Sequence, residues 1–132
     1  MTYKRTYNSD RSGYKPRSPV FLGGVVKWWR ANCCMSDWDL QLSLDPSPPD
    51  WVDPPWYGTL GRSSTSAQGY AAMVWLNLAA CRRNDCDPMG VLFHELGHVW
   101  LYANDLSTHS ERLVNLLEAF FVKAFYFDRR SR

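Results

Sequence analysis

The sequence has no hydrophobic run long enough to cross a membrane. A transmembrane helix needs about 20 consecutive apolar residues, and charged residues or glycines interrupt every apolar stretch of this 132-residue chain well before that length. Residues 1–17 also contain no apolar core of the kind that a secretory signal peptide requires. We therefore expect a cytoplasmic protein that does not associate with membranes.

The sequence also lacks a recognisable cysteine motif, and its net charge is small. The four cysteines, Cys33, Cys34, Cys81 and Cys86, match neither a CxxC pair nor a common zinc-ribbon spacing. We expect buried free thiols, and a disulfide between Cys81 and Cys86 is the alternative. The formal net charge is +2, which is too small to indicate a nucleic-acid partner for the chain as a whole.

The basic residues are concentrated near the N-terminus. Residues 1–17 carry five basic residues against the single acid Asp10, and three tyrosines lie among them. The basic residues are Lys4, Arg5, Arg11, Lys15 and Arg17, and the tyrosines are Tyr3, Tyr7 and Tyr14. We expect residues 1–17 to form a basic aromatic arm outside the folded domain, which then comprises residues 18–132.

The rest of the chain has the composition of one folded domain, because 45% of all residues are hydrophobic and 15% are aromatic. Hydrophobic periodicity, prolines and capping residues predict its elements. These are a helix over 19–34 capped by Ser18, a strand over 37–45, a proline-rich loop over 46–58, a strand over 70–79, and helices over 88–103 and 111–128. The order predicts an α+β fold with a small, mostly antiparallel sheet packed against the N-terminal helix, the helix over 88–103 and the C-terminal helix.

The two predicted strands differ in how their apolar residues are arranged. The strand over 37–45 alternates strictly between apolar and polar residues, which predicts one buried face and one solvated face. The strand over 70–79 is apolar on both faces. We therefore expect the second strand to lie in the centre of the sheet or under a covering segment.

The stretch "GVLFHELGHVWL", residues 90–101, carries the pattern that points to chemistry. His94 and His98 are four residues apart, so a helix places both imidazoles on one face, where they can bind the same tetrahedral metal ion. Glu95 lies one step around the helix, from where it can reach a water molecule bound to that metal. Two ligands and one general base are what a hydrolytic zinc ion requires.

The "HELGH" motif, the preceding "AAMVWLNL" and the following "ERLVNLLEAF" together resemble the small gluzincin-type zinc metallopeptidases, which include ImmA/IrrE-like and phage-encoded minimal forms. Residues 37–127 follow the order of elements in such proteins. The resemblance implies a minimal zincin-like fold and one zinc ion. It also implies that the strand over 70–79 pairs with an extended substrate peptide.

Three residues are candidates for the third zinc ligand. In the gluzincin resemblance it is a glutamate on the next helix, followed four residues later by a residue that orients a ligand histidine, which gives Glu111 with Asn115. If the two helices are antiparallel and the second begins near Thr108, Glu118 is instead level with the metal. Glu111 then completes a capping box with Thr108. His109 is the third candidate.

The pattern predicts a zinc metallopeptidase that hydrolyses a protein or peptide substrate, with Glu95 as general base and Tyr102 or His109 as candidate donors to the oxyanion. A structural or interaction protein that keeps the metallopeptidase fold is the alternative, for example in a virion, with the arm over 1–17 as the element that binds an assembly partner. Binding of nucleic acid through the arm is a weaker third possibility.

Overall fold

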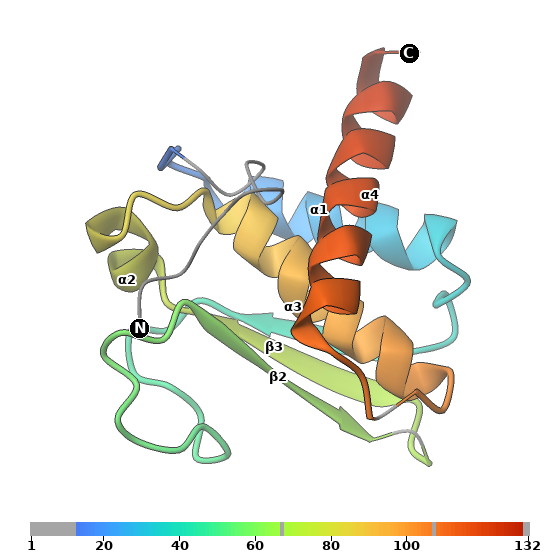
Figure 1. Ribbon diagram of the computed structural model, residues 1–132, viewed down its shortest axis with the longest axis horizontal. Coiled ribbons are helices and arrows are strands. Elements are labelled where there is room, and N and C mark those ends of the chain that lie inside the picture. Colours follow the sequence, from blue (N-terminus) through green and yellow to red (C-terminus); the bar gives the residue numbers. More distant parts are fainter. Residues whose placement is uncertain (1–12, 67, 107, 131–132) are drawn as a thin grey trace.

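The computed structural model describes residues 13–66, 68–106 and 108–130, so residues 1–12 of the predicted arm lie outside the described part. In chain order the elements are α1 (Pro19–Asn32), β1 (Asp39–Ser43), β2 (Gly61–Ser66), β3 (Ala71–Leu76), α2 (Leu78–Arg83), α3 (Pro88–Ala103) and α4 (Glu111–Arg130). Helices and a small sheet occur in one unit, which confirms the α+β prediction (Figure 1).

The sheet has the strand order β1-β3-β2, so β3 is the central strand, as its two apolar faces predict. The sheet is mixed, because β1 pairs with β3 in parallel and β2 pairs with β3 in antiparallel orientation. The prediction that this strand pairs with a substrate peptide is wrong for a physical reason. Both of its edges already carry backbone hydrogen bonds to neighbouring strands, and the outer edge of the sheet on one side belongs to β2.

Neither β2 nor α2 was predicted, because neither has the required pattern. The sequence of β2 is "GRSSTS", which contains no apolar alternation. This segment becomes a strand through its pairing along β3 and through Gly61, where a Cβ would come within 3.2 Å of both Leu76 and Val91. The short helix α2 is capped by Asn77, whose side chain accepts a hydrogen bond from the Ala80 N–H.

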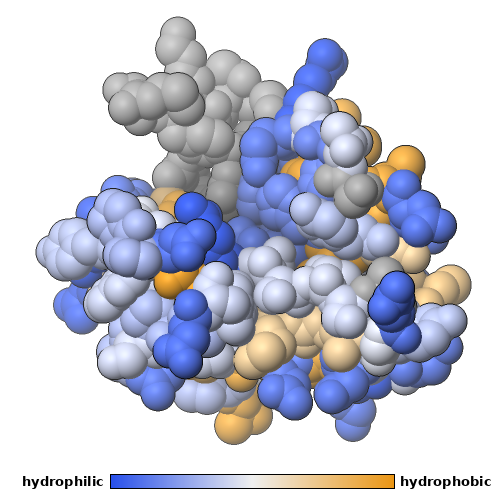
Figure 2. Space-filling view, turned by 90° about the horizontal axis from the view of Figure 1, so that it is seen from below, coloured by the Kyte–Doolittle hydropathy of each residue, from blue (hydrophilic) through white to orange (hydrophobic). Residues whose placement is uncertain are grey.

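The helices α1, α3 and α4 lie on one side of the sheet (Figure 1). The sheet residues that face them are buried and include Leu40, Val74 and Leu76. Seen from the opposite side, the molecule presents mainly hydrophilic residues with small hydrophobic patches (Figure 2). Trp56 of the proline-rich loop packs edge-on against Trp75, with ring centroids 6.3 Å apart, and the Trp75 indole N–H donates to the carbonyl of Asp45 at 2.8 Å. The helices therefore supply most of the core and the motif helix lies inside it.

All four cysteines are free thiols, so no disulfide joins Cys81 to Cys86. These two are buried, whereas Cys33 is half-buried and Cys34 is exposed. The predicted free thiols are confirmed, and their predicted burial holds for Cys81 and Cys86. Among the described residues, no helix combines the length and the hydrophobicity that a bilayer-spanning segment needs.

Arg17, a residue of the predicted arm, contacts the residue that caps the start of α3. Asp87 caps α3 by accepting a hydrogen bond from the Met89 N–H at 3.0 Å. The Arg17 guanidinium donates to both carboxylate oxygens of Asp87, at 3.0 and 2.8 Å. The Tyr14 N–H also donates to the Asp85 carboxylate. Tyr14 and Arg17 of the predicted arm are therefore bonded to the domain, and the boundary after residue 17 stays a prediction.

We predict that Arg17→Ala lowers the free energy of unfolding by about 2 kcal/mol, because it leaves the Asp87 carboxylate, only 2% exposed, without its charged partner. Urea denaturation followed by tryptophan fluorescence measures this change. Lys15→Ala is the matched control, since Lys15 is exposed, and it should change stability by less than about 0.5 kcal/mol. Equal stability of the two variants would show that the Arg17 contact does not hold α3.

Candidate metal centre

The two motif histidines lie on the face of α3 that meets α4. His94 is 7% exposed and His98 is half-buried, and their ring centroids are 5.1 Å apart. The predicted helix thus places the two imidazoles side by side, as the spacing of four residues requires. Hydrophobic residues surround the pair along α3, including Leu92, Phe93 and Leu96, all of which are fully buried. The site is consequently anchored in the core.

Glu111, the first residue of α4, completes a group with both histidines. Its Oε2 lies 3.0 Å from His94 Nε2, and its Oε1 lies 3.1 Å from His98 Nε2. The Glu111 side chain is 65% exposed, so it closes the site from the solvent side. Hydrogen bonds from the His94 and His98 imidazoles are the main reason why the pKa of the Glu111 carboxylate lies well below its ordinary value.

The spacing of these three residues fits a metal ion. One ligand atom from each of His94, His98 and Glu111 can be chosen so that all lie within 4.8 Å of one another. In a tetrahedral site with metal–ligand distances of roughly 2.1 Å, neighbouring ligand atoms are ~3.4 Å apart. The distances from the two Glu111 oxygens to the imidazoles, 3.0 and 3.1 Å, are near that value. This group could therefore hold a metal ion.

Glu118, the rival for third ligand, contacts the opposite side of the His94 ring. Its Oε1 lies 3.0 Å from His94 Nδ1, and its side chain is fully buried. A His94 that donates its Nδ1–H to this carboxylate presents Nε2 on the Glu111 side of the ring, where that nitrogen could bind a metal. The structure thus places Glu118 in the orienting role that the sequence assigned to Asn115. Asn115 is buried on the same helix, and its predicted role stays a prediction.

The start of α4 corrects the predicted capping box. The Leu113 N–H donates to the Ser110 hydroxyl at 3.2 Å, so Ser110 rather than Thr108 caps the helix. Glu111 then stands in the first turn instead of at the third helical position. Its carboxylate points at the two motif histidines.

His109 contacts His98 and does not belong to the group of three. His98 Nδ1 and His109 Nε2 are 2.8 Å apart, and His109 Nδ1 lies 2.6 Å from the carbonyl oxygen of Leu106. His109 therefore lies behind a ligand histidine, and the structure gives no support to its candidacy as third ligand. The Tyr102 ring packs edge-on against His109 with centroids 5.6 Å apart. The oxyanion role of either residue stays a prediction.

Glu95 is buried beside the pair of histidines, with 7% of its surface exposed. Burial raises its pKa above the ordinary glutamate value, while His94, His98, Arg62 and a hydrogen bond from Ser63 act in the opposite direction. Arg62 and Ser63 could not be found from the sequence, because both lie on β2, which has no periodic pattern of apolar residues. Only the pairing of β2 with β3 brings Ser63 to the motif helix.

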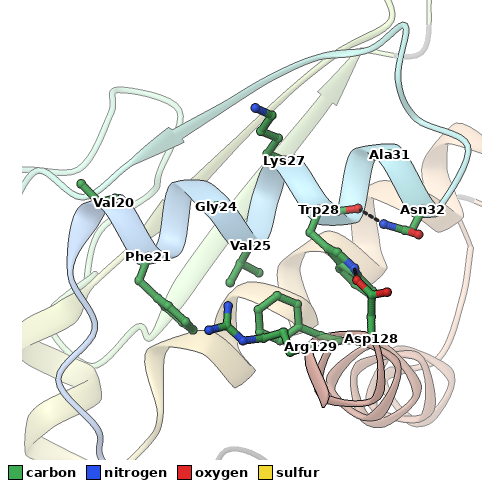
Figure 3. Close-up of a pocket in the computed structure, with 11 residues that line it drawn as sticks. Val20, Phe21, Gly24, Val25, Lys27, Trp28, Ala31, Asn32, Asp128 and Arg129 are labelled. Carbon is green, nitrogen blue, oxygen red and sulfur yellow. Dashed lines mark hydrogen bonds between the residues drawn. The ribbon is translucent and has the colours of Figure 1, made fainter. Parts of the chain in front are cut away.

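Two concavities of the described part of the chain lie away from this group. One, of about 710 Å³, is a groove between α1 and the C-terminal half of α4, where the Trp28 indole donates to Asp128 near Phe21 and Arg129 (Figure 3). The other, of about 540 Å³, lies between Trp38, Trp100 and Phe120. Neither is lined by His94, His98 or Glu111.

No family model, curated protein or solved structure matches the chain.

We predict that Glu111→Ala removes most of the affinity for divalent metal, whereas Glu118→Ala weakens it by about 10- to 100-fold, as loss of a residue that orients a ligand does. Titration of the metal-free protein with Co²⁺, followed by visible absorption, measures both. Glu118→Gln is the matched control, since its side-chain oxygen still accepts from His94. A stronger loss for Glu118→Ala than for Glu111→Ala would mean that Glu118 is the ligand.

Proposed function

We propose that the protein is a zinc-dependent metallopeptidase in which His94, His98 and Glu111 bind one zinc ion. The observation that carries this proposal is the convergence of three ligand atoms next to a buried Glu95. Two imidazoles and one carboxylate form a donor set that suits zinc and leaves a fourth position for water or substrate. The resemblance of "HELGH" to gluzincin-type peptidases points to the same chemistry.

Glu95 is the proposed general base. When bound, a zinc ion would polarise a scissile carbonyl and lower the pKa of a water molecule next to Glu95. The Glu95 carboxylate accepts a proton from that water and donates it to the leaving amine. The burial that raises its pKa suits this exchange, because a base that must also return the proton works best when its pKa approaches the working pH.

An extended segment of a protein is the proposed substrate. The strand β2 lies at an edge of the sheet, and its Ser63 hydrogen-bonds to Glu95. A peptide that pairs with the outer edge of β2 would run beside the metal centre, because backbone hydrogen bonds hold an added strand in register. The site is accessible from the side of Glu111, whose side chain is 65% exposed, so a segment of a protein can approach it there.

A second candidate function is a structural or interaction role with little or no catalysis, for example in a virion. The observation in its favour is a row of exposed hydrophobic side chains along α4, formed by Leu113, Leu116, Phe120 and Phe127. Exposed apolar rows of this kind mark protein contact surfaces. The arm over 1–17 is the other proposed element for an assembly partner, and nucleic acid remains the weaker possibility for it.

We predict that the purified protein contains one zinc ion and that Glu95→Gln keeps the zinc but abolishes cleavage, because an amide cannot accept a proton from the water. Elemental analysis gives the zinc content, and mass spectrometry of α-casein, an unstructured protein used as a probe, gives cleavage. The control is Asp105→Asn, which changes an exposed carboxylate in the α3–α4 loop and should retain full activity. Cleavage by Glu95→Gln at the wild-type rate would exclude the proposed mechanism.

A further inference from the structure

A chain of hydrogen bonds runs from the candidate metal centre into the loop between α3 and α4. His98 directs Nε2 at Glu111, 3.1 Å away, and Nδ1 at His109 Nε2, 2.8 Å away. His109 in turn directs Nδ1 at the carbonyl oxygen of Leu106, 2.6 Å away. Two imidazoles in series thus connect a ligand position to a backbone carbonyl.

The donors and acceptors of this chain fix where the protons are. The Leu106 carbonyl can only accept, so the bond to it requires a proton on His109 Nδ1. A neutral His109 then has a lone pair on Nε2, which accepts from His98. Consequently His98 carries a proton on Nδ1, and Nε2, which faces Glu111 in the metal-free protein, is the nitrogen that can bind a metal. The hydrogen bond that one ring nitrogen makes decides which atom remains for the metal.

The two ligand histidines are held by different kinds of acceptor. His94 is held by the fully buried carboxylate of Glu118, whereas His98 is held by the neutral ring of His109. The first acceptor belongs to the middle of a helix, and the second depends on the α3–α4 loop. Tyr102 packs against His109 at an interplanar angle of 84°, which keeps the ring in the plane that the chain needs.

We propose that His109 is a positioning residue for the metal centre, which holds His98 in the tautomer with the proton on Nδ1 and thereby ties the ligand to the Leu106 carbonyl. The inference rests on the proposed function for the role of the metal, but the tautomer of His98 is a property of the metal-free protein. A histidine that served only to fix the loop would leave that tautomer unchanged when replaced.

Two substitutions separate these roles. His109→Gln supplies an amide oxygen that accepts from His98, and His109→Phe keeps a ring against Tyr102 but supplies no acceptor. Long-range ¹H–¹⁵N NMR of the metal-free protein at a pH well above the usual histidine pKa of about 6.5 reports the tautomer of His98. Co²⁺ titration of the same samples reports metal affinity.

We expect the Nδ1–H tautomer of His98 in the wild type and in His109→Gln, and its loss in His109→Phe. Co²⁺ affinity should fall by about 10- to 100-fold in His109→Phe and by only a few-fold in His109→Gln. A wild type with the proton of His98 on Nε2, or equal affinities of the two variants, would overturn the proposal. If the tautomer is as expected but the wild type binds no Co²⁺, the proposed function fails. The part of the proposal that stands is that His109 determines the tautomer of His98.

Discussion

The close approach of α4 to α3 is the constraint on which the candidate metal centre depends. It occurs at Gly97, between the two histidines, where a Cβ would lie 3.3 Å from a methyl carbon of Val114. A side chain at this position would require Val114 to shift by a few tenths of an ångström. Glu111 lies one turn before Val114, so the position of the candidate third ligand depends on this close packing. Gly97 thus allows the two helices to pack closely, while the two histidines and the glutamate of "HELGH" form the site.

The same approach explains how two glutamates of one helix reach one imidazole. Glu111 and Glu118 are two turns apart on α4, and they contact opposite nitrogens of His94. The exposed carboxylate lies where a metal would bind, and the buried one fixes the orientation of the ring. Burial of the Glu118 charge would be costly alone, and the hydrogen bond to His94 offsets that cost. The interior of the domain therefore stabilises one orientation of the ligand.

Much of this arrangement follows from the sequence. The helical spacing of His94 and His98 and the two apolar faces of the central strand required no tertiary information. The choice between Glu111 and Glu118 did, because it depends on how α4 crosses α3 (Figure 1). The helix begins at Glu111, as the range 111–128 predicts and later than the start near Thr108 on which the argument for Glu118 relies, and both glutamates contact His94. The strand β2 could not be predicted, since its polar sequence takes its conformation from its partner.

Anomalous diffraction at the zinc absorption edge, from crystals of the zinc-loaded protein, tests the account most directly. The account predicts one strong peak about 2.0–2.2 Å from His94 Nε2, His98 Nε2 and a Glu111 oxygen, with His94 Nδ1 still on Glu118 and His98 Nδ1 still on His109. A peak bound to Glu118 or His109 in place of Glu111, or no peak between the two motif histidines, would contradict it.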